Sequence, residues 1–261
     1  MEHTTYLFID GRYAQDIYCK AMQRVFEEPG ELSVHAMVSS IGRQPFRTYY
    51  YDCVDDLKKS SETESDFQAR LAKQEEFFTR TSSLYGVHFQ RGTLKGQRRR
   101  EQKEVDVLLA VDMLTHGFNR SMTRAILIAG DLDFRPVVEA LVRHGIFVEI
   151  WYEKTSAAKE LPLAADFGRA LNWHVLLSWS SPEFSGLHTC PWTLTGHGPL
   201  LTTWVIRSGL IAGRKIVLAQ ESPVHSPILR YEGPSGVEWW THKDEAVLVR
   251  YFEMLYGRID W

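Results

Sequence analysis

Short apolar runs alternate with amphipathic segments along the first two-thirds of the chain. Strand-like runs are short and rich in β-branched or aromatic residues, whereas the segments between them repeat apolar residues at helical spacing. Residues 124–129 are almost continuously apolar, which is typical of a central parallel strand covered on both faces. The pattern predicts strands at 6–9, 47–51, 86–90, 124–129 and 146–151, and helices at 17–26, 66–85, 104–116, 134–144 and 161–171. This alternation favours a three-layer α/β fold with a mostly parallel sheet.

The composition changes at residues 178–182, a Ser-, Trp- and Pro-containing stretch. Downstream, glycine and proline recur between short β-prone runs such as 215–218 and 237–240, and a helical pattern covers about 243–256. We therefore expect an α/β domain over residues 1–180 and a small C-terminal α+β domain over residues 181–261. Neighbouring tryptophans in the second of these runs, Trp239 and Trp240, should lie on opposite faces of a strand.

Charge and cysteine content narrow the class of protein. Thirty Lys and Arg against 33 Asp and Glu give a net charge of −3, so any nucleic-acid contact must be local. The three cysteines are isolated and form no CxxC pair, which favours neither a zinc site nor a disulfide framework. The first residues lack a basic and apolar leader, and no run of eighteen apolar residues occurs. We expect a cytoplasmic protein without a membrane span.

Acidic residues follow three of the expected strands. Asp10 follows Ile9, Asp52 follows Tyr51, and Asp131 comes two residues after the 124–129 run; Asp106 lies in the first turn of the helix expected at 104–116. Ligands of open parallel sheets bind beyond the carboxyl ends of the strands. Carboxylates gathered there repel one another unless a divalent cation neutralises them, and Mg²⁺ and Mn²⁺ prefer oxygen ligands. The sequence therefore predicts a site for Mg²⁺ or Mn²⁺.

Each of these acids also has a plainer interpretation. Asp10 before a glycine suits a turn, and Asp106 complements the dipole at the start of a helix. Asp133 is well explained as the N-cap of the helix expected from Phe134. Asp55 and Asp56 follow Asp52 in the same turn and are alternatives to it.

Asp112 differs from the other acids because helical spacing places it on the apolar face of its helix, in line with Val105 and Leu109. A carboxylate on such a face needs a partner. We expect Asp112 to stabilise the site without binding the metal itself, by accepting hydrogen bonds from backbone N–H groups or from a basic side chain near the site.

A basic segment precedes the helix that carries Asp106. Its cationic residues are Lys95, Arg98, Arg99, Arg100 and Lys103. Long cationic side chains beside a carboxylate cluster favour contacts with the phosphates of a nucleic acid. The alternative is an exposed, solvated loop without a ligand.

Five segments in order resemble an NYN domain, and in particular the LabA-like branch of the PIN-like nuclease superfamily: residues 7–11, 50–52, 103–114, 130–134 and 164–167. The resemblance covers about two-thirds of the chain and implies a metal-dependent ribonuclease on a PIN-like fold. It implies that Asp10, Asp52, Asp106 and Asp131 hold the catalytic metal, with Asp133 as an auxiliary ligand. The first motif departs from the family, because Tyr13 stands where the family usually has asparagine.

The preferred function is therefore hydrolysis of RNA phosphodiester bonds with Mg²⁺ or Mn²⁺, with DNA as a second possible substrate. The alternative is a catalytically weak module that binds RNA or protein, which the tyrosine at position 13 favours. A phosphatase of the haloacid type is disfavoured, because Arg12 stands where that chemistry needs a second acid. The C-terminal domain is a candidate surface for a protein partner or for self-association.

Overall fold

The computed structural model describes residues 4–42, 44–92, 103–194, 204–220 and 225–261. The chain divides into two compact units. The first, called here the sheet unit, comprises Met1–Tyr18 and Leu32–Ser180; the second, called the C-terminal unit, comprises Cys19–Glu31 and Ser181–Trp261. The chain leaves the sheet unit after Ser180, and the assignment of Cys19–Glu31 to the C-terminal unit was not expected.

The sheet unit contains six strands in the order β3-β2-β1-β4-β5-β6, and each of the five pairings between neighbours is parallel. The chain moves from β1 outward to β3, then returns to β4 and moves outward in the other direction. Between β1 and β4 the strand order therefore reverses, which in such sheets is where ligands bind. The strands are β1 (Thr5–Asp10), β2 (Arg47–Cys53), β3 (Val87–Gly92), β4 (Arg124–Ile128), β5 (Phe147–Tyr152) and β6 (Phe167–Ala170).

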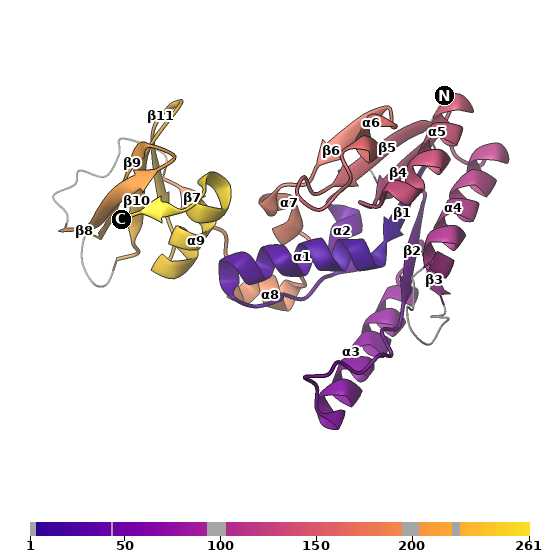
Figure 1. The fold of residues 1–261 in the computed structure, drawn as a ribbon, viewed down its shortest axis with the longest axis horizontal. Helices are drawn as coiled ribbons and strands as arrows, with labels where there is room; N and C mark the ends of the chain where they lie inside the picture. Colours follow the sequence, from indigo (N-terminus) through magenta and orange to yellow (C-terminus); the bar gives the residue numbers. More distant parts are fainter. Residues whose placement is uncertain (1–3, 43, 93–102, 195–203, 221–224) are drawn as a thin grey trace. The chain divides into compact units, whose positions relative to one another are not determined.

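Helices cover both faces of this sheet (Figure 1). Alternate residues of β2 show which helix covers which face: Tyr50 contacts Gln15 of α1 and Phe77 of α3, whereas the hydroxyl of Tyr51 contacts Asp112 of α4. The predicted α/β fold is confirmed. The helical segments of the sheet unit are α1 (Gly11–Phe26, whose second half belongs to the C-terminal unit), α2 (Val34–Ser39), α3 (Glu64–Ser82), α4 (Lys103–Phe118), the 3₁₀ turn η1 (Leu132–Phe134), α5 (Arg135–Arg143), α6 (Glu160–Leu163) and α7 (Trp173–Leu177).

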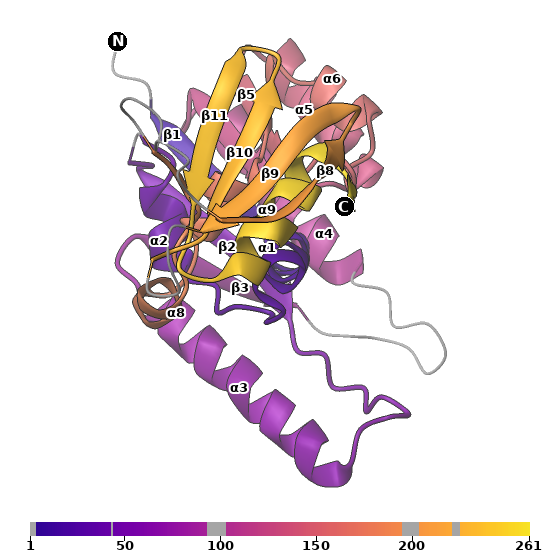
Figure 2. The same ribbon diagram turned by 90° about the vertical axis from the view of Figure 1, so that its left-hand side faces the viewer.

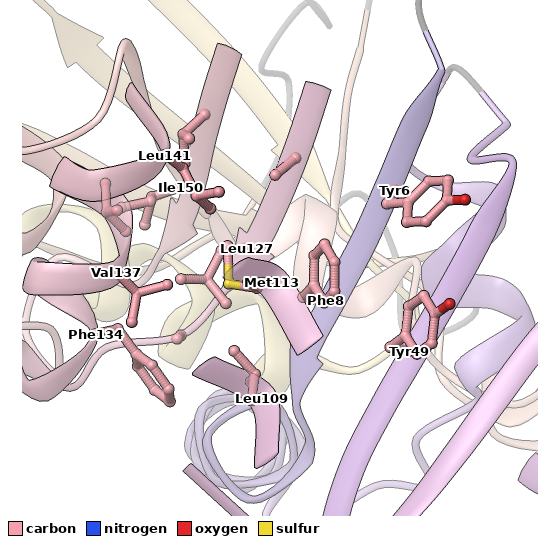
Figure 3. Packing of buried hydrophobic residues seen from close by; sticks show 14 of the residues in the cluster. Tyr6, Phe8, Tyr49, Leu109, Met113, Leu127, Phe134, Val137, Leu141 and Ile150 are labelled. Atoms are coloured by element: carbon pink, nitrogen blue, oxygen red, sulfur yellow. The ribbon is translucent and has the colours of Figure 1, made fainter. Parts of the chain in front are cut away.

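The core on the α4 side joins the strands to α4 and α5. Figure 3 shows Phe8 of β1 and Leu127 of β4 packed beside Met113 of α4 and Val137 of α5. These side chains are almost fully buried. Burial on this scale fixes α4, and hence the first turn that carries Asp106, against the sheet.

One predicted helix is wrong. The expected helix at 161–171 ends after one turn, as α6, and Phe167–Ala170 form the edge strand β6. The Asp166 carboxylate accepts a hydrogen bond from the backbone N–H of Val148 in β5 (2.8 Å), which brings the following residues alongside β5. Pairing with this strand edge overrides the local helical pattern.

The C-terminal unit is an antiparallel sheet with a helix packed on one face, which confirms the expected α+β class. Its strand order is β12-β8-β9-β10-β11-β7. Trp240 contacts Tyr251 and Phe252 of the helix, whereas Trp239 lies beside Arg230 on the opposite face, as the alternation predicts. Figure 2 shows the central strands of this sheet with α9. The elements are α8 (Pro182–Leu187), β7 (Trp192–Thr193), β8 (Trp204–Ile211), β9 (Arg214–Gln220), β10 (Ile228–Gly233), β11 (Gly236–Thr241), α9 (Glu245–Tyr256) and β12 (Ile259–Asp260).

Of the helices described, none combines the length and the apolar character that crossing a membrane requires.

Candidate active site

Asp10 is the last residue of β1, and α1 begins at the next residue without the expected loop. The turn depends on Gly11, because a Cβ atom there would lie 2.5 Å from Cε1 of Tyr50 and 2.7 Å from the backbone oxygen of Tyr51. The N–H of Tyr13, in the first turn of α1, donates to Oδ1 of Asp10 (3.0 Å). The tight turn at Gly11 therefore places the buried carboxylate of Asp10 at the carboxyl end of the sheet.

Asp131 lies at the end of the neighbouring strand. Ile9 pairs with Ile128 of β4, so Asp131 stands just beyond the level of Asp10 on the other side of the strand-order reversal. Its Oδ1 accepts the N–H of Asp133 (3.0 Å), which makes Asp131 the N-cap of η1. The expectation that Asp133 caps the following helix is wrong: Phe134 holds the N-cap position of α5 without a side-chain hydrogen bond.

Asp106 occupies the first turn of α4, as expected, and its charge interacts with those of the other two acids. Burial, followed by repulsion from Asp131 and Asp133, raises the pKa of Asp106 to about 6. Burial raises the pKa of Asp10 to about 7; the hydrogen bond from the N–H of Tyr13 opposes this increase, and the charges of Asp106, Asp52 and Asp131 add to it. We call Asp10, Asp106 and Asp131 the acidic triad.

Asp52 is buried nearby but is oriented differently. Asp10 pairs with Tyr51, so the alternation along β2 turns Asp52 toward α1 rather than α4. Its Oδ1 accepts the N–H of Cys53 (2.8 Å) and its Oδ2 accepts Nε2 of Gln15 (2.8 Å). Burial raises the pKa of Asp52 to about 7. Both oxygens of Asp52 therefore already have donors, whereas each acid of the triad retains at least one oxygen without a hydrogen bond to any described residue.

Asp112 has a partner of a kind that the sequence did not indicate. The hydroxyl of Tyr51 donates to Oδ2 of Asp112 (2.8 Å), joining β2 to α4 two turns beyond Asp106. Burial and the charge of Asp112 raise the pKa of the Tyr51 hydroxyl, so it stays a donor. Asp112 thus holds the helix that carries Asp106 in register with the sheet.

The donor chemistry of the acidic triad fits a divalent cation, because a hard metal ion relieves the repulsion between neighbouring carboxylates. Their arrangement is not a preformed cage: no three His, Cys, Asp or Glu side chains among the described residues converge closely enough to hold an ion. The carboxylates would have to close around the metal when it binds.

A sequence profile of the NYN domain matches residues 4–170. The chain belongs to the NYN domain family. This match includes the whole six-stranded sheet and every acidic residue discussed above. The NYN family has a PIN-like fold and consists in general of nuclease-like hydrolases, which gives the coarse class of this protein. The LabA-like branch within the family stays a prediction.

Comparison with solved structures gives a crystal structure of a Vibrio parahaemolyticus protein of unknown function. It shares 14% identity with this chain, covering 66% of this chain and 94% of that one, with a TM-score of 0.46. No curated protein matches the chain.

Several parts of this NYN domain were not found from the sequence. Gln15, which holds Asp52, gave no recognisable signal. Tyr13 stood out in the sequence, but nothing there indicated that its hydroxyl accepts the N–H of Glu153 (2.8 Å). Glu153 follows the last residue of β5, and the rule that located Asp10 would have located it. Of the basic segment, Lys103 is the first residue of α4 rather than part of a loop. The expected phosphate contacts Lys95, Arg98, Arg99 and Arg100 lie outside the described residues.

Proposed function

We propose that this NYN protein is a metal-dependent ribonuclease that hydrolyses phosphodiester bonds at the acidic triad. The observation that carries the proposal is that Asp10, Asp106 and Asp131 interact electrostatically at the reversal of strand order between β1 and β4, where burial raises the pKa values of Asp10 and Asp106. An acidic cluster that includes a buried carboxylate, here Asp10, costs stability and is typical of functional sites.

Asp10, Asp106 and Asp131 would hold the metal through the oxygens that have no described donor. Mg²⁺ or Mn²⁺ bound there would supply a water of lowered pKa and would offset the negative charge of the scissile phosphate. The hydrogen bonds from the N–H groups of Tyr13 and Asp133 fix the carboxylates of Asp10 and Asp131 in orientation. Asp52 and Asp133 would add negative charge around the metal rather than bind it directly.

The proposed reaction needs no side-chain nucleophile. The metal would supply the activated water, and the chain would contribute orientation of the phosphate and a fixed electrostatic field. The proposal covers single-stranded or structured RNA, with DNA to be tested beside it.

The test is cleavage of labelled RNA and DNA by the full-length protein with Mn²⁺, Mg²⁺ or EDTA. We expect cleavage of RNA with either metal and none with EDTA. Asp10→Asn and Asp131→Asn should each lower the rate at least about 100-fold, because each removes a ligand charge. Glu139→Gln, at a partly exposed carboxylate on α5 that pairs with Arg135, is the matched control and should cleave normally.

A protein that binds RNA but cleaves no substrate with either metal would favour the alternative, a catalytically weak binding module. The absence of a preformed metal cage among the described residues is the observation that favours this alternative. Normal cleavage by Asp10→Asn would remove Asp10 from the site.

A further inference from the structure

The segment that follows β5 lies at the same edge of the sheet as the acidic triad. It runs from Glu153 to Lys159, between β5 and α6, and we call it the β5–α6 segment. Because β4 and β5 are parallel neighbours, their carboxyl ends lie side by side. The segment therefore borders Asp131.

Two hydrogen bonds attach the β5–α6 segment to the loops of the site. The backbone N–H of Glu153 donates to the hydroxyl oxygen of Tyr13 (2.8 Å), and the N–H of Ala158 donates to the carbonyl of Gly130 (2.9 Å). The ring of Tyr13 packs against Gly130, where an added Cβ would lie 2.3 Å from Cε2 of Tyr13. One side chain thus connects the ends of β1, β4 and β5.

The segment is also ordered internally. The Glu153 carboxylate accepts the N–H (3.0 Å) and the hydroxyl (2.7 Å) of Thr155, and the N–H of Ala157 donates to the carbonyl of Glu153 (3.1 Å). Glu153 therefore uses its charge within the turn. The turn presents the exposed Lys154, and the exposed Lys159 follows the Ala158 attachment.

These two lysines differ from the arginines at the same edge. Arg12 pairs with Asp55, Arg91 with Glu75, and Arg135 with Glu139. Lys154 and Lys159 are exposed, and neither pairs with a carboxylate among the residues that the structure describes. An acidic edge that accepts a nucleic acid needs cations that are free to contact phosphate oxygens.

We propose that the β5–α6 segment binds the phosphates of the nucleic-acid strand through Lys154 and Lys159, and that Tyr13 is the positioning residue that holds it beside the acidic triad. This inference rests on the proposed function for the identity of the ligand. The tyrosine in the position that the family usually gives to asparagine then has a role: its length allows the hydroxyl to reach Glu153.

The experiment measures affinity of the full-length protein for short labelled single-stranded RNA and DNA in EDTA, over a range of salt concentrations. Lys154→Ala/Lys159→Ala should weaken binding to both strands about 10-fold at low salt and lower the salt slope by about 1.4, or about 0.7 for each phosphate contact. The charge-matched control is Lys73→Ala/Arg143→Ala, on α3 and at the end of α5, which should leave affinity and slope unchanged.

Tyr13→Phe tests the positioning role, because it keeps the ring and removes only the hydroxyl. We expect it to weaken binding and lower the salt slope, and to have little further effect when combined with Lys154→Ala/Lys159→Ala, since residues that act through one another are not additive. If the triple variant loses as much binding free energy as Tyr13→Phe and Lys154→Ala/Lys159→Ala lose together, the positioning role of Tyr13 is overturned.

If Lys154→Ala/Lys159→Ala binds with the affinity and the salt slope of the wild type, the inference is overturned. It is also overturned if the wild type binds neither the RNA nor the DNA. The metal-dependent cleavage assay decides the proposed function separately. Metal-dependent cleavage of RNA by the wild type, together with normal binding by the lysine variant, would support the proposed ribonuclease and overturn the proposed phosphate contact.

Discussion

Asp10 is a residue whose burial costs stability and which lies in the proposed metal site. Its side chain is almost fully buried, with 7% exposed, and three other carboxylates interact with it. Burial is the main reason that its pKa rises from 3.8 to about 7. A group that binds its proton more tightly in the folded protein contributes most to stability below the unfolded pKa, and this contribution is lost as the pH rises through the folded pKa.

We therefore predict that metal-free Asp10→Asn gains stability relative to the wild type as the pH rises. The difference should be small near pH 4 and should develop between pH 4 and about pH 7, reaching on the order of 1–4 kcal/mol by pH 8. Urea denaturation of both proteins in EDTA across this range measures it. Glu139→Gln is the control, and a difference that is flat with pH would show that Asp10 ionises normally.

The sequence indicated the positions of Asp10 and Asp131 because strand ends are visible in it, and that of Asp106 because the start of its helix is. It did not reveal the orientation of Asp52, since the face on which a side chain lies depends on which residues pair between β1 and β2. The register that pairs Asp10 with Tyr51 is a tertiary property. The role of Tyr13 was hidden for the same reason, because its partner Glu153 is 140 residues away in the chain.

Between elements, the Tyr51–Asp112 hydrogen bond adds a polar contact to the apolar packing of α4 against the sheet. Helical spacing placed Asp112 correctly on the inner face of α4, but the sequence gave no means of choosing its partner from the opposite strand. The same limit explains the wrong helix at 161–171, where Phe167–Ala170 pair with β5. Elements with a strong internal pattern, such as β4 and α5, were predicted well because their periodicity is local.

Tyr51→Phe should lower the free energy of unfolding by about 1–2 kcal/mol, because it leaves the partly buried Asp112 carboxylate without its hydroxyl donor. Asp106 lies two turns from Asp112 on the same helix, so cleavage should also slow. Tyr85→Phe, at a fully exposed tyrosine, is the control for urea denaturation and for cleavage. Equal stability of the two variants would show that the Tyr51–Asp112 hydrogen bond contributes nothing.

At the scale of the whole molecule, α1 belongs to both units. Its first half carries Tyr13 and Gln15, whereas Cys19–Glu31 belong to the C-terminal unit. There, the ring of Phe26 meets that of Phe184 in α8 edge to face at 5.8 Å, and Nε of Arg250 in α9 donates to the carbonyl of Val25 (2.8 Å). The composition change near residue 180 carried no signal for this earlier segment.

A fragment of residues 1–180 contains the whole acidic triad, yet it removes the residues that cover the end of α1. We predict that it exposes Val25 and Phe26, binds a hydrophobic dye and self-associates. A fragment of residues 1–190 keeps α8 and its Phe184, so it should remain more soluble and melt cooperatively. Phe26→Ser in the shorter fragment is the matched variant, and it should reduce self-association if Phe26 causes it.

Light scattering, dye binding and thermal melts compare the three proteins. A monomeric 1–180 fragment that melts at the same temperature as 1–190 would show that the sheet unit folds without this cover. Because every residue of the triad lies in both fragments, metal-dependent cleavage by either soluble fragment would place the chemistry entirely within residues 1–190.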